Sequence, residues 1–111
     1  MDRVEQYTQI VQQTIHEFYN LYLQMQDAQT FCIVDPASRH YQVIQTGWDS
    51  RHRRIYTCLH LSIQNEKVYI YSDPTEEGIA NILIEKGIPQ WDIVLEYQAP
   101  ELRQYTSFAQ G

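Results

Sequence analysis

The chain is short of several features that would point to particular classes of protein. It has only two cysteines, Cys32 and Cys58, in 111 residues. Both lie in apolar stretches typical of strands, so buried reduced thiols are favoured over a disulfide framework. No apolar run approaches the roughly 20 residues that span a bilayer, and the N-terminal MDRVEQYTQ lacks the apolar stretch of a signal peptide. We therefore expect a cytoplasmic protein with no membrane segment.

Basic residues are also scarce. Eight Lys and Arg stand against fourteen Asp and Glu, which gives a net charge of −6. Proteins that bind nucleic acid tightly are usually basic, because Lys and Arg release the counterions that surround phosphates. The composition therefore disfavours autonomous DNA binding and predicts at most weak or indirect contact with DNA. A protein partner is the better expectation.

The sequence lacks the common catalytic motifs. There is no Gly-rich phosphate loop, no G-x-S-x-G, no C-x-x-C and no H-E-x-x-H. The histidines fall on a predicted helix, turn, loop and strand, and nothing predicts that they converge on a metal: His16, His40, His52 and His60. His60 follows Cys58 on one strand, but an ordinary strand residue facing tyrosines explains it better than a thiol–imidazole pair. We predict no catalytic residue, no metal and no cofactor.

At 111 residues, with 43% of them hydrophobic, the chain should form one domain, residues 1–111. Apolar residues recur at steps of three and four from Val4 through Val11 and Phe18, which predicts an amphipathic helix over residues 3–24. This stripe should pack on the sheet face that carries Leu59, Leu61 and Ile70. Beyond it the period becomes two, as in strands.

Four strands are expected in sequence, the first at about residues 30–35. In the third, the alternation puts two sets of residues on opposite faces: Ile55, Leu59, Leu61 and Ile63 on one, and Tyr56, Cys58, His60 and Ser62 on the other. A two-residue turn at Asn65-Glu66 joins the third and fourth strands. The predicted register pairs Ile63 with Val68, Leu61 with Ile70, Ser62 with Tyr69 and His60 with Tyr71.

A second helix should begin after Asp73 as N-cap, with Glu76 completing a capping box. It should end at Gly87 in a left-handed cap, with Ile88 in the accompanying contact. A last helix is expected from Pro100. The predicted fold is therefore α+β: a two-layer sandwich in which a long N-terminal helix and C-terminal helices pack on a four-stranded antiparallel sheet.

Tyrosine suggests an interaction surface. Tyr56, Tyr69 and Tyr71 should share the sheet face that the helices leave uncovered, and tyrosine is favoured in interfaces because it combines rigid area with a polar tip. Either another protein chain docks there or the C-terminal segment folds over it. If the tyrosines are buried within the monomer, the segment from Pro100 to Phe108 is the next candidate.

The stretch GWDSRHRRIY, residues 47–56, turns the corner between the second and third strands. Its arginines are Arg51, Arg53 and Arg54, and strand alternation points the last two to opposite faces. On a chain with a net charge of −6, they are better suited to an acidic partner or to solvent than to nucleic acid. With the three tyrosines they form the predicted interaction surface.

Taken whole, the sequence resembles the XisI family, the fdxN element excision controlling factors of cyanobacteria. The most telling pieces are Gly47-Trp48, Arg53-Arg54-Ile55-Tyr56, Gly78-Ile79-Ala80-Asn81, Gly87-Ile88-Pro89, Asp92-Ile93-Val94-Leu95 and Pro100-Glu101. The resemblance extends over essentially all 111 residues.

The resemblance implies a role in programmed DNA rearrangement. In that family, XisI works with the nuclease-like XisH to support or control a recombinase, XisF, that excises an element from a nitrogen-fixation gene. It implies no chemistry for XisI itself, and an XisH-like protein as the partner. Two alternatives stay open: an antitoxin-like inhibitor that restrains an XisH-like nuclease and, less favoured, a direct DNA-binding regulator. A homo-oligomer is also open.

Overall fold

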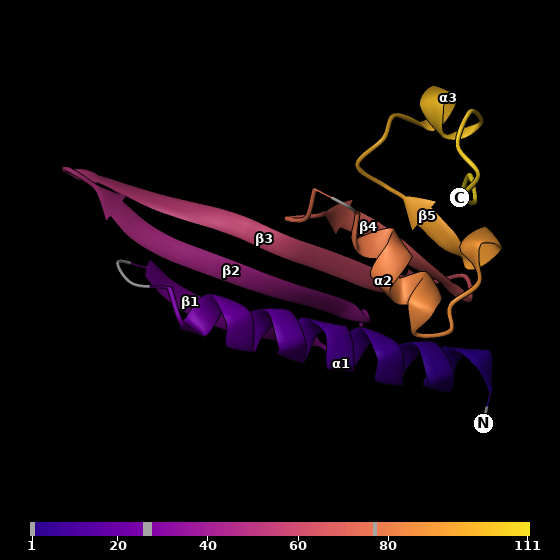
Figure 1. Cartoon of the computed structure of the whole chain (residues 1–111), viewed down its shortest axis with the longest axis horizontal. Coiled ribbons are helices and arrows are strands. Elements are labelled where there is room, and N and C mark those ends of the chain that lie inside the picture. Colours follow the sequence, from indigo (N-terminus) through magenta and orange to yellow (C-terminus); the bar gives the residue numbers. More distant parts are fainter. Residues whose placement is uncertain (1, 26–27, 77) are drawn as a thin grey trace.

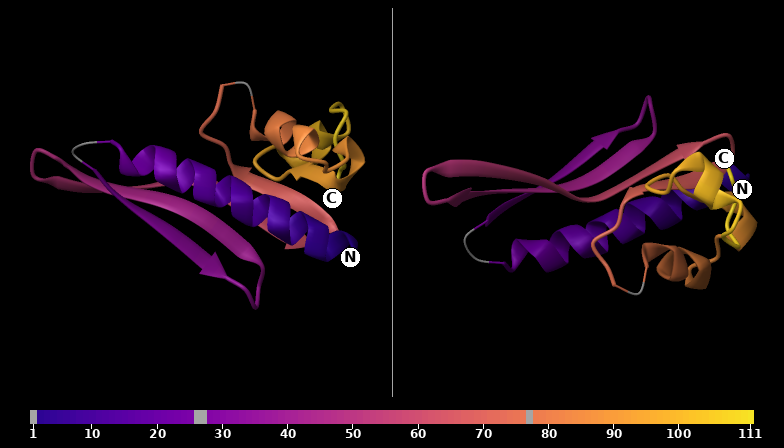
Figure 2. Two further views of the ribbon diagram at one scale, coloured as in Figure 1. Left: turned by 60° about the horizontal axis from the view of Figure 1, so that its bottom comes forward. Right: turned by 90° about the horizontal axis from the view of Figure 1, so that it is seen from above.

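The computed structural model describes residues 2–25, 28–76 and 78–111. Its elements in chain order are α1 (Arg3–Leu23), β1 (Ala28–Asp35), β2 (His40–Asp49), β3 (His52–Gln64), β4 (Lys67–Ser72), α2 (Ile79–Glu85), the 3-10 turn η1 (Gln90–Asp92), β5 (Ile93–Leu95) and α3 (Pro100–Arg103). The strands form one sheet in the order β1-β2-β3-β4-β5 (Figure 1). Both α1 and α2 lie on the same side of this sheet (Figure 2). The predicted α+β fold is confirmed.

The sheet has five strands, so the prediction of four antiparallel strands is incomplete. β1 to β4 pair antiparallel, as expected. β5 pairs parallel with β4, Ile93 lying opposite Val68 and Leu95 opposite Ile70. A parallel neighbour requires a crossover between the two strands, and the segment that contains α2 makes it. With only three residues, β5 is too short for alternation to reveal it.

The helix α1 has nearly the predicted bounds, 3–23 against 3–24. It begins where the Asp2 carboxylate accepts a hydrogen bond from the backbone N–H of Glu5 at 2.8 Å, a side-chain N-cap. Its buried stripe runs through Val11 and Ile15 and packs in one cluster with Leu59, Leu61 and Ile70, all of them fully buried. Packing of α1 on this sheet face, which we call the inner face, is confirmed.

The N-terminal turns of α1 are joined to η1 by a buried polar contact that the sequence did not suggest. The Tyr7 hydroxyl donates a hydrogen bond to the Asp92 carboxylate, and both residues are buried. Burial, followed by this hydrogen bond, raises the pKa of Tyr7 to about 12. The Arg3 guanidinium lies 3.8 Å from the same carboxylate. The beginning of the chain is thereby fixed to the segment that leads into β5.

The turn between β3 and β4 is the one predicted. Asn65 and Glu66 form a two-residue loop, with φ of 52° and 59°. Two consecutive positive φ values match the right-handed twist of the strands. The predicted pairs of Ile63 with Val68, Leu61 with Ile70 and Ser62 with Tyr69 are confirmed. The fourth is wrong, because the register shifts between His60 and Leu61, and His60 lies opposite Ser72 rather than Tyr71.

A second register shift lies between β2 and β3. Val43 lies opposite Leu59 and Ile44 opposite Thr57, so that Cys58 is an extra residue in β3. A bulge of this kind carries the residues before it onto the other face of the sheet. The prediction that Ile55 shares the core face of Leu59 is therefore wrong: Ile55 is 67% exposed, whereas Leu59 is fully buried.

The second helix ends as predicted but begins later. The N–H of Gly87, whose φ is 115°, bonds to the carbonyl of Ile84, and the N–H of Ile88 bonds to that of Leu83 at 3.0 Å, a Schellman cap. At the other end, the helix starts at Ile79, so Glu76 precedes it and the predicted capping box is wrong. Asp73 still caps it from a distance, accepting a hydrogen bond from the Ile79 N–H at 2.8 Å.

The last predicted helix is present as the four residues Pro100–Arg103. The segment after it runs beside β5, where Ala109 makes an isolated parallel bridge with Val94. The Arg103 guanidinium donates to the carbonyls of Leu95 and Gln98 at 3.2 Å and 2.9 Å. The C-terminal segment therefore lies against β5, at the end of the sheet opposite β1.

Replacing a core leucine tests the packing of α1 on the sheet. We expect Leu61→Ala to lower the free energy of unfolding by about 2–5 kcal/mol, because it removes buried methyl groups and leaves a cavity. Urea denaturation followed by circular dichroism measures the change. The matched control is Leu21→Ala, at a leucine of α1 that is 55% exposed, for which we expect about 0.5 kcal/mol or less. Equal losses in both variants would contradict this arrangement of the core.

Candidate interaction surface

The β2–β3 hairpin extends past the end of α1 (Figure 1). We call residues 46–57, which form this extension and its turn, the distal hairpin. The helix ends at Leu23, so no described helix packs on the tip of the hairpin, and its large side chains stay in solvent. Trp48 is 66% exposed, and Ile55 and Tyr56 are also exposed. Large apolar side chains gathered in solvent are typical of a protein-binding surface.

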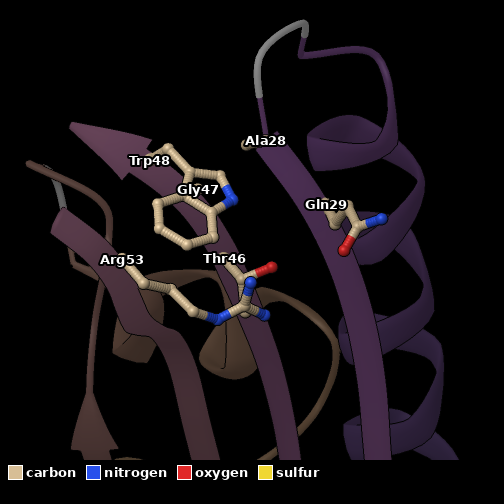
Figure 3. A pocket seen from close by; sticks show the side chains of 6 residues that line it. All are labelled: Ala28, Gln29, Thr46, Gly47, Trp48 and Arg53. Atoms are coloured by element: carbon tan, nitrogen blue, oxygen red, sulfur yellow. The ribbon is translucent and has the colours of Figure 1, made fainter. Parts of the chain in front are cut away.

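On the outer face of the sheet, the face away from α1, Trp48 and Arg53 lie together. They are opposite one another in the β2–β3 register. The Arg53 guanidinium carbon lies 5.7 Å from the centre of the Trp48 ring, within the range of a cation–π contact. With Gln29 and Thr46 they line a shallow pocket of about 510 Å³ (Figure 3). This pocket presents an aromatic ring beside a cation.

On the inner face of the distal hairpin, Arg54 and Tyr56 are bonded to each other. The Arg54 guanidinium donates to the Tyr56 hydroxyl at 3.1 Å and forms an ion pair with Asp49. The predicted placement of Arg53 and Arg54 on opposite faces is therefore confirmed. Because Arg54 is already neutralised by Asp49, it has less to offer an anionic ligand than Arg53, for which no carboxylate lies within 4 Å among the described residues.

The predicted interaction surface is split by the structure. The bulge at Cys58 places Tyr56 on the inner face, because Tyr56 lies opposite Gln45, which alternates with the core residue Val43. Tyr69 and Tyr71 lie beyond the bulge, and Tyr69 is only 8% exposed. The prediction that the three tyrosines share one exposed face is wrong. A contact role for Arg51, Arg53, Arg54 and Tyr56 stays a prediction.

Tyr71 instead belongs to a row of polar rings on the outer face. The His40 Nδ1 and His60 Nε2 atoms are 2.9 Å apart, the His60 and Tyr71 rings are stacked with centroids 4.4 Å apart, and the Tyr71 hydroxyl is 3.0 Å from Ser62 Oγ. The pKa of His60 is lowered, first by burial and then by the neighbouring His40. This row is a structural network of hydrogen bonds and ring stacking that links β2, β3 and β4.

Cys58 is separated from this row. Its Sγ atom lies 3.6 Å from the Gln45 side-chain oxygen and it packs against the core on the inner face, so the prediction that it shares a face with His60 and Ser62 is wrong. Burial raises the pKa of the Cys58 thiol, which lowers its thiolate fraction and its reactivity. The interpretation of His60 as a strand residue facing tyrosine, rather than a partner of Cys58, agrees with these contacts.

The described residues contain neither a cluster of metal ligands nor a membrane-spanning helix. No three His, Cys, Asp or Glu side chains within residues 2–25, 28–76 and 78–111 are close enough together to hold a metal ion. No helix in the same ranges has the length and apolar character needed to cross a bilayer.

Comparison with known proteins gives a consistent result. The family model described as XisI protein matches residues 1–110. The crystal structure of the fdxN element excision controlling factor XisI from Anabaena variabilis ATCC 29413 is 32% identical, with a TM-score of 0.89 over 99% of this chain and 100% of that one. A XisI-like protein from the same organism is 30% identical, with a TM-score of 0.87 over 97% and 98%. None of the curated proteins matches the sequence.

The lowered pKa of His60 makes stability depend on pH. Unfolded His60 takes up a proton near its ordinary pKa of about 6.5, whereas folded His60 does so only at lower pH. The unfolded state therefore binds more protons in this window, and stability falls as the pH drops below about 6.5. We expect His60→Gln, whose amide can still bond to His40, to lose less stability between about pH 7.5 and 5.5 than the wild type.

Thermal unfolding at each pH measures this effect. The control is His52→Gln, at an exposed residue of the distal hairpin, which should keep the pH dependence of the wild type. The same pH dependence in His60→Gln and wild type would show that His60 does not titrate as its surroundings indicate.

Proposed function

The chain belongs to the XisI family, and from this we propose that it is a non-catalytic controlling factor of DNA excision that acts by binding another protein. The family match and the similarity to the Anabaena variabilis factor support a role in excision. The proposed mode of action rests on one observation above all: Trp48 and Arg53 form an exposed ring-and-cation pair at the end of a projecting hairpin.

Such a pair is suited to be the centre of a protein interface. Tryptophan and arginine are the residues most enriched among those that dominate binding energy. Both already lie against each other, so binding fixes fewer free rotamers than it would for two separate side chains. Ile55 extends the surface with apolar area on the same face. The partner that the family implies is an XisH-like protein, and an acidic or aromatic side chain of that protein would complement Arg53.

Direct DNA binding has less support. The cations of the distal hairpin are Arg51, Arg53 and Arg54, and the last is already paired with Asp49. The chain as a whole carries a net charge of −6, which repels phosphates at low salt. A protein that can neutralise so few phosphates gains little from counterion release.

Binding to the partner tests the proposed mode of action. We expect the double variant Trp48→Ala, Arg53→Ala to weaken binding to the XisH-like protein by at least about 2 kcal/mol in isothermal titration calorimetry. It should unfold at the wild-type temperature, because both side chains are exposed. The matched control is Trp91→Ala, which removes an exposed tryptophan side chain outside the distal hairpin. Unchanged affinity in the double variant would place the contact elsewhere.

A titration with duplex DNA tests the alternative of a direct DNA reader. We expect weak binding that depends steeply on salt and shows no sequence preference, because few phosphates can be neutralised. Fluorescence anisotropy with the purified chain at near-physiological salt, about 0.15 M, measures it. Tight, sequence-specific binding would contradict the proposed function and favour the DNA-binding regulator.

A further inference from the structure

The strand β1 is a free edge of the sheet. It is first in the strand order and pairs with β2 along all eight of its residues without a register shift. Figure 2 shows it along the outer margin of the molecule. No strand among the described residues covers its other side. An uncovered edge offers a row of backbone N–H and C=O groups to any strand that approaches.

This edge lacks the features that usually prevent such pairing. Proteins protect edge strands with charges, prolines or bulges. Residues 28–34, AQTFCIV, contain no charge and no proline, and the pairing with β2 has no bulge there. Asp35, which ends the strand, is the first charged residue. The edge is therefore open to pairing over seven residues.

The middle of the edge, around Cys32, is also neutral on both faces. On the outer face, Phe31 and Ile33 are 45% and 46% exposed. On the inner face, a groove of about 300 Å³ separates α1 from β1, and its lining includes no Asp, Glu, Lys or Arg: Gln12, Ile15, His16, Cys32 and Val34. On a chain with a net charge of −6, two copies repel each other least where the surface carries no charge.

We propose that β1 pairs antiparallel with β1 of a second copy, which joins two sheets of five strands into one continuous sheet of ten. A two-fold axis at Cys32 would place Phe31 of each copy opposite Ile33 of the other. Aromatic side chains opposite β-branched ones are favourable cross-strand pairs. The two inner-face grooves would meet beneath the joined strands, and both copies of α1 would lie on the same side.

The charges at the two ends of β1 favour a second copy over an unrelated strand. Antiparallel pairing brings Asp35 of each copy to the Ala28 end of its partner. On the outer face at that end lies the Arg53 guanidinium, which lines a pocket with Ala28 and Gln29 and lies beside Thr46 in Figure 3. Asp35 of each copy would thereby come near an arginine of its partner, a favourable pairing of opposite charges. This pairing of two copies does not depend on the proposed function, because it concerns the purified chain alone.

Sedimentation equilibrium of the purified full chain across a dilution series tests the proposal. We expect a monomer–dimer equilibrium in the wild type. Ile33→Lys puts a charge on the edge strand, as natural edges do, and should raise the dimer dissociation constant at least about tenfold. The matched control is Ile55→Lys, which makes the same change on the same face but two strands from the edge, and should leave the dissociation constant unchanged.

The two variants distinguish edge pairing from other interfaces. Dimers in wild type and Ile55→Lys, with Ile33→Lys dissociated, support edge pairing. A wild type that is monomeric at every concentration overturns it. Equal changes of the dimer dissociation constant in the two variants also overturn it. If two copies packed outer face to outer face, both variants would weaken the dimer. If they bound through a distant surface, neither variant would. Circular dichroism checks that Ile33→Lys is folded, and Phe31→Lys is the second edge variant if it is not.

Discussion

Val43 lies opposite Leu59, but the next residue of β2, Ile44, lies opposite Thr57, so that β3 carries Cys58 as an extra residue. The core holds this register, because Val43 and Leu59 are fully buried beneath α1. Beyond Cys58 the side chains of β3 change faces. The bulge thereby sends Ile55 to the outer face and Tyr56 to the inner one. The surface that the distal hairpin presents to a partner depends on this single residue.

The length of α1 explains why the bulge is tolerated. The helix ends at Leu23, and the last buried inner-face residue of β3 toward the hairpin tip is Leu59. Without a helix above it, the distal hairpin has no core to fill on its inner face. Polar contacts occupy that face, where Arg54 bonds to Tyr56 and pairs with Asp49. The apolar residues Ile55 and Phe31 therefore lie on the outer face, which Trp48 and Arg53 share. The uncovered outer face extends from the free edge at β1 to the hairpin end.

The parts of the fold set by a regular period or by a local turn could be predicted from the sequence. These include α1, the Asn65-Glu66 turn and the Gly87 cap, each of which depends on residues close together in the chain. Constant alternation along β3 failed, because a bulge leaves no mark in the pattern: Ile55 is in phase with Leu59, yet lies on the other face. The late start of α2 depends on local hydrogen bonds, in which the Asp73 carboxylate accepts from Thr75 and Ile79. The pairing of β5 depends on contacts between residues far apart in the chain. For the predicted surface, strand alternation alone was enough to place Arg53 and Arg54 on opposite faces. The burial of Tyr69 depends on packing that the sequence does not show.

The neutral edge at β1 and the apolar outer face beside it are suited to bind protein rather than to remain in solvent. Hydrogen–deuterium exchange of the β1 amides tests this most directly, because alternate N–H groups of an unpaired edge strand point into water. In concentrated solution we expect slow exchange at every amide from residue 28 to residue 34, with alternate amides becoming fast on dilution as the second strand leaves. Fast exchange of alternate β1 amides at every concentration would show that no second strand pairs with this edge.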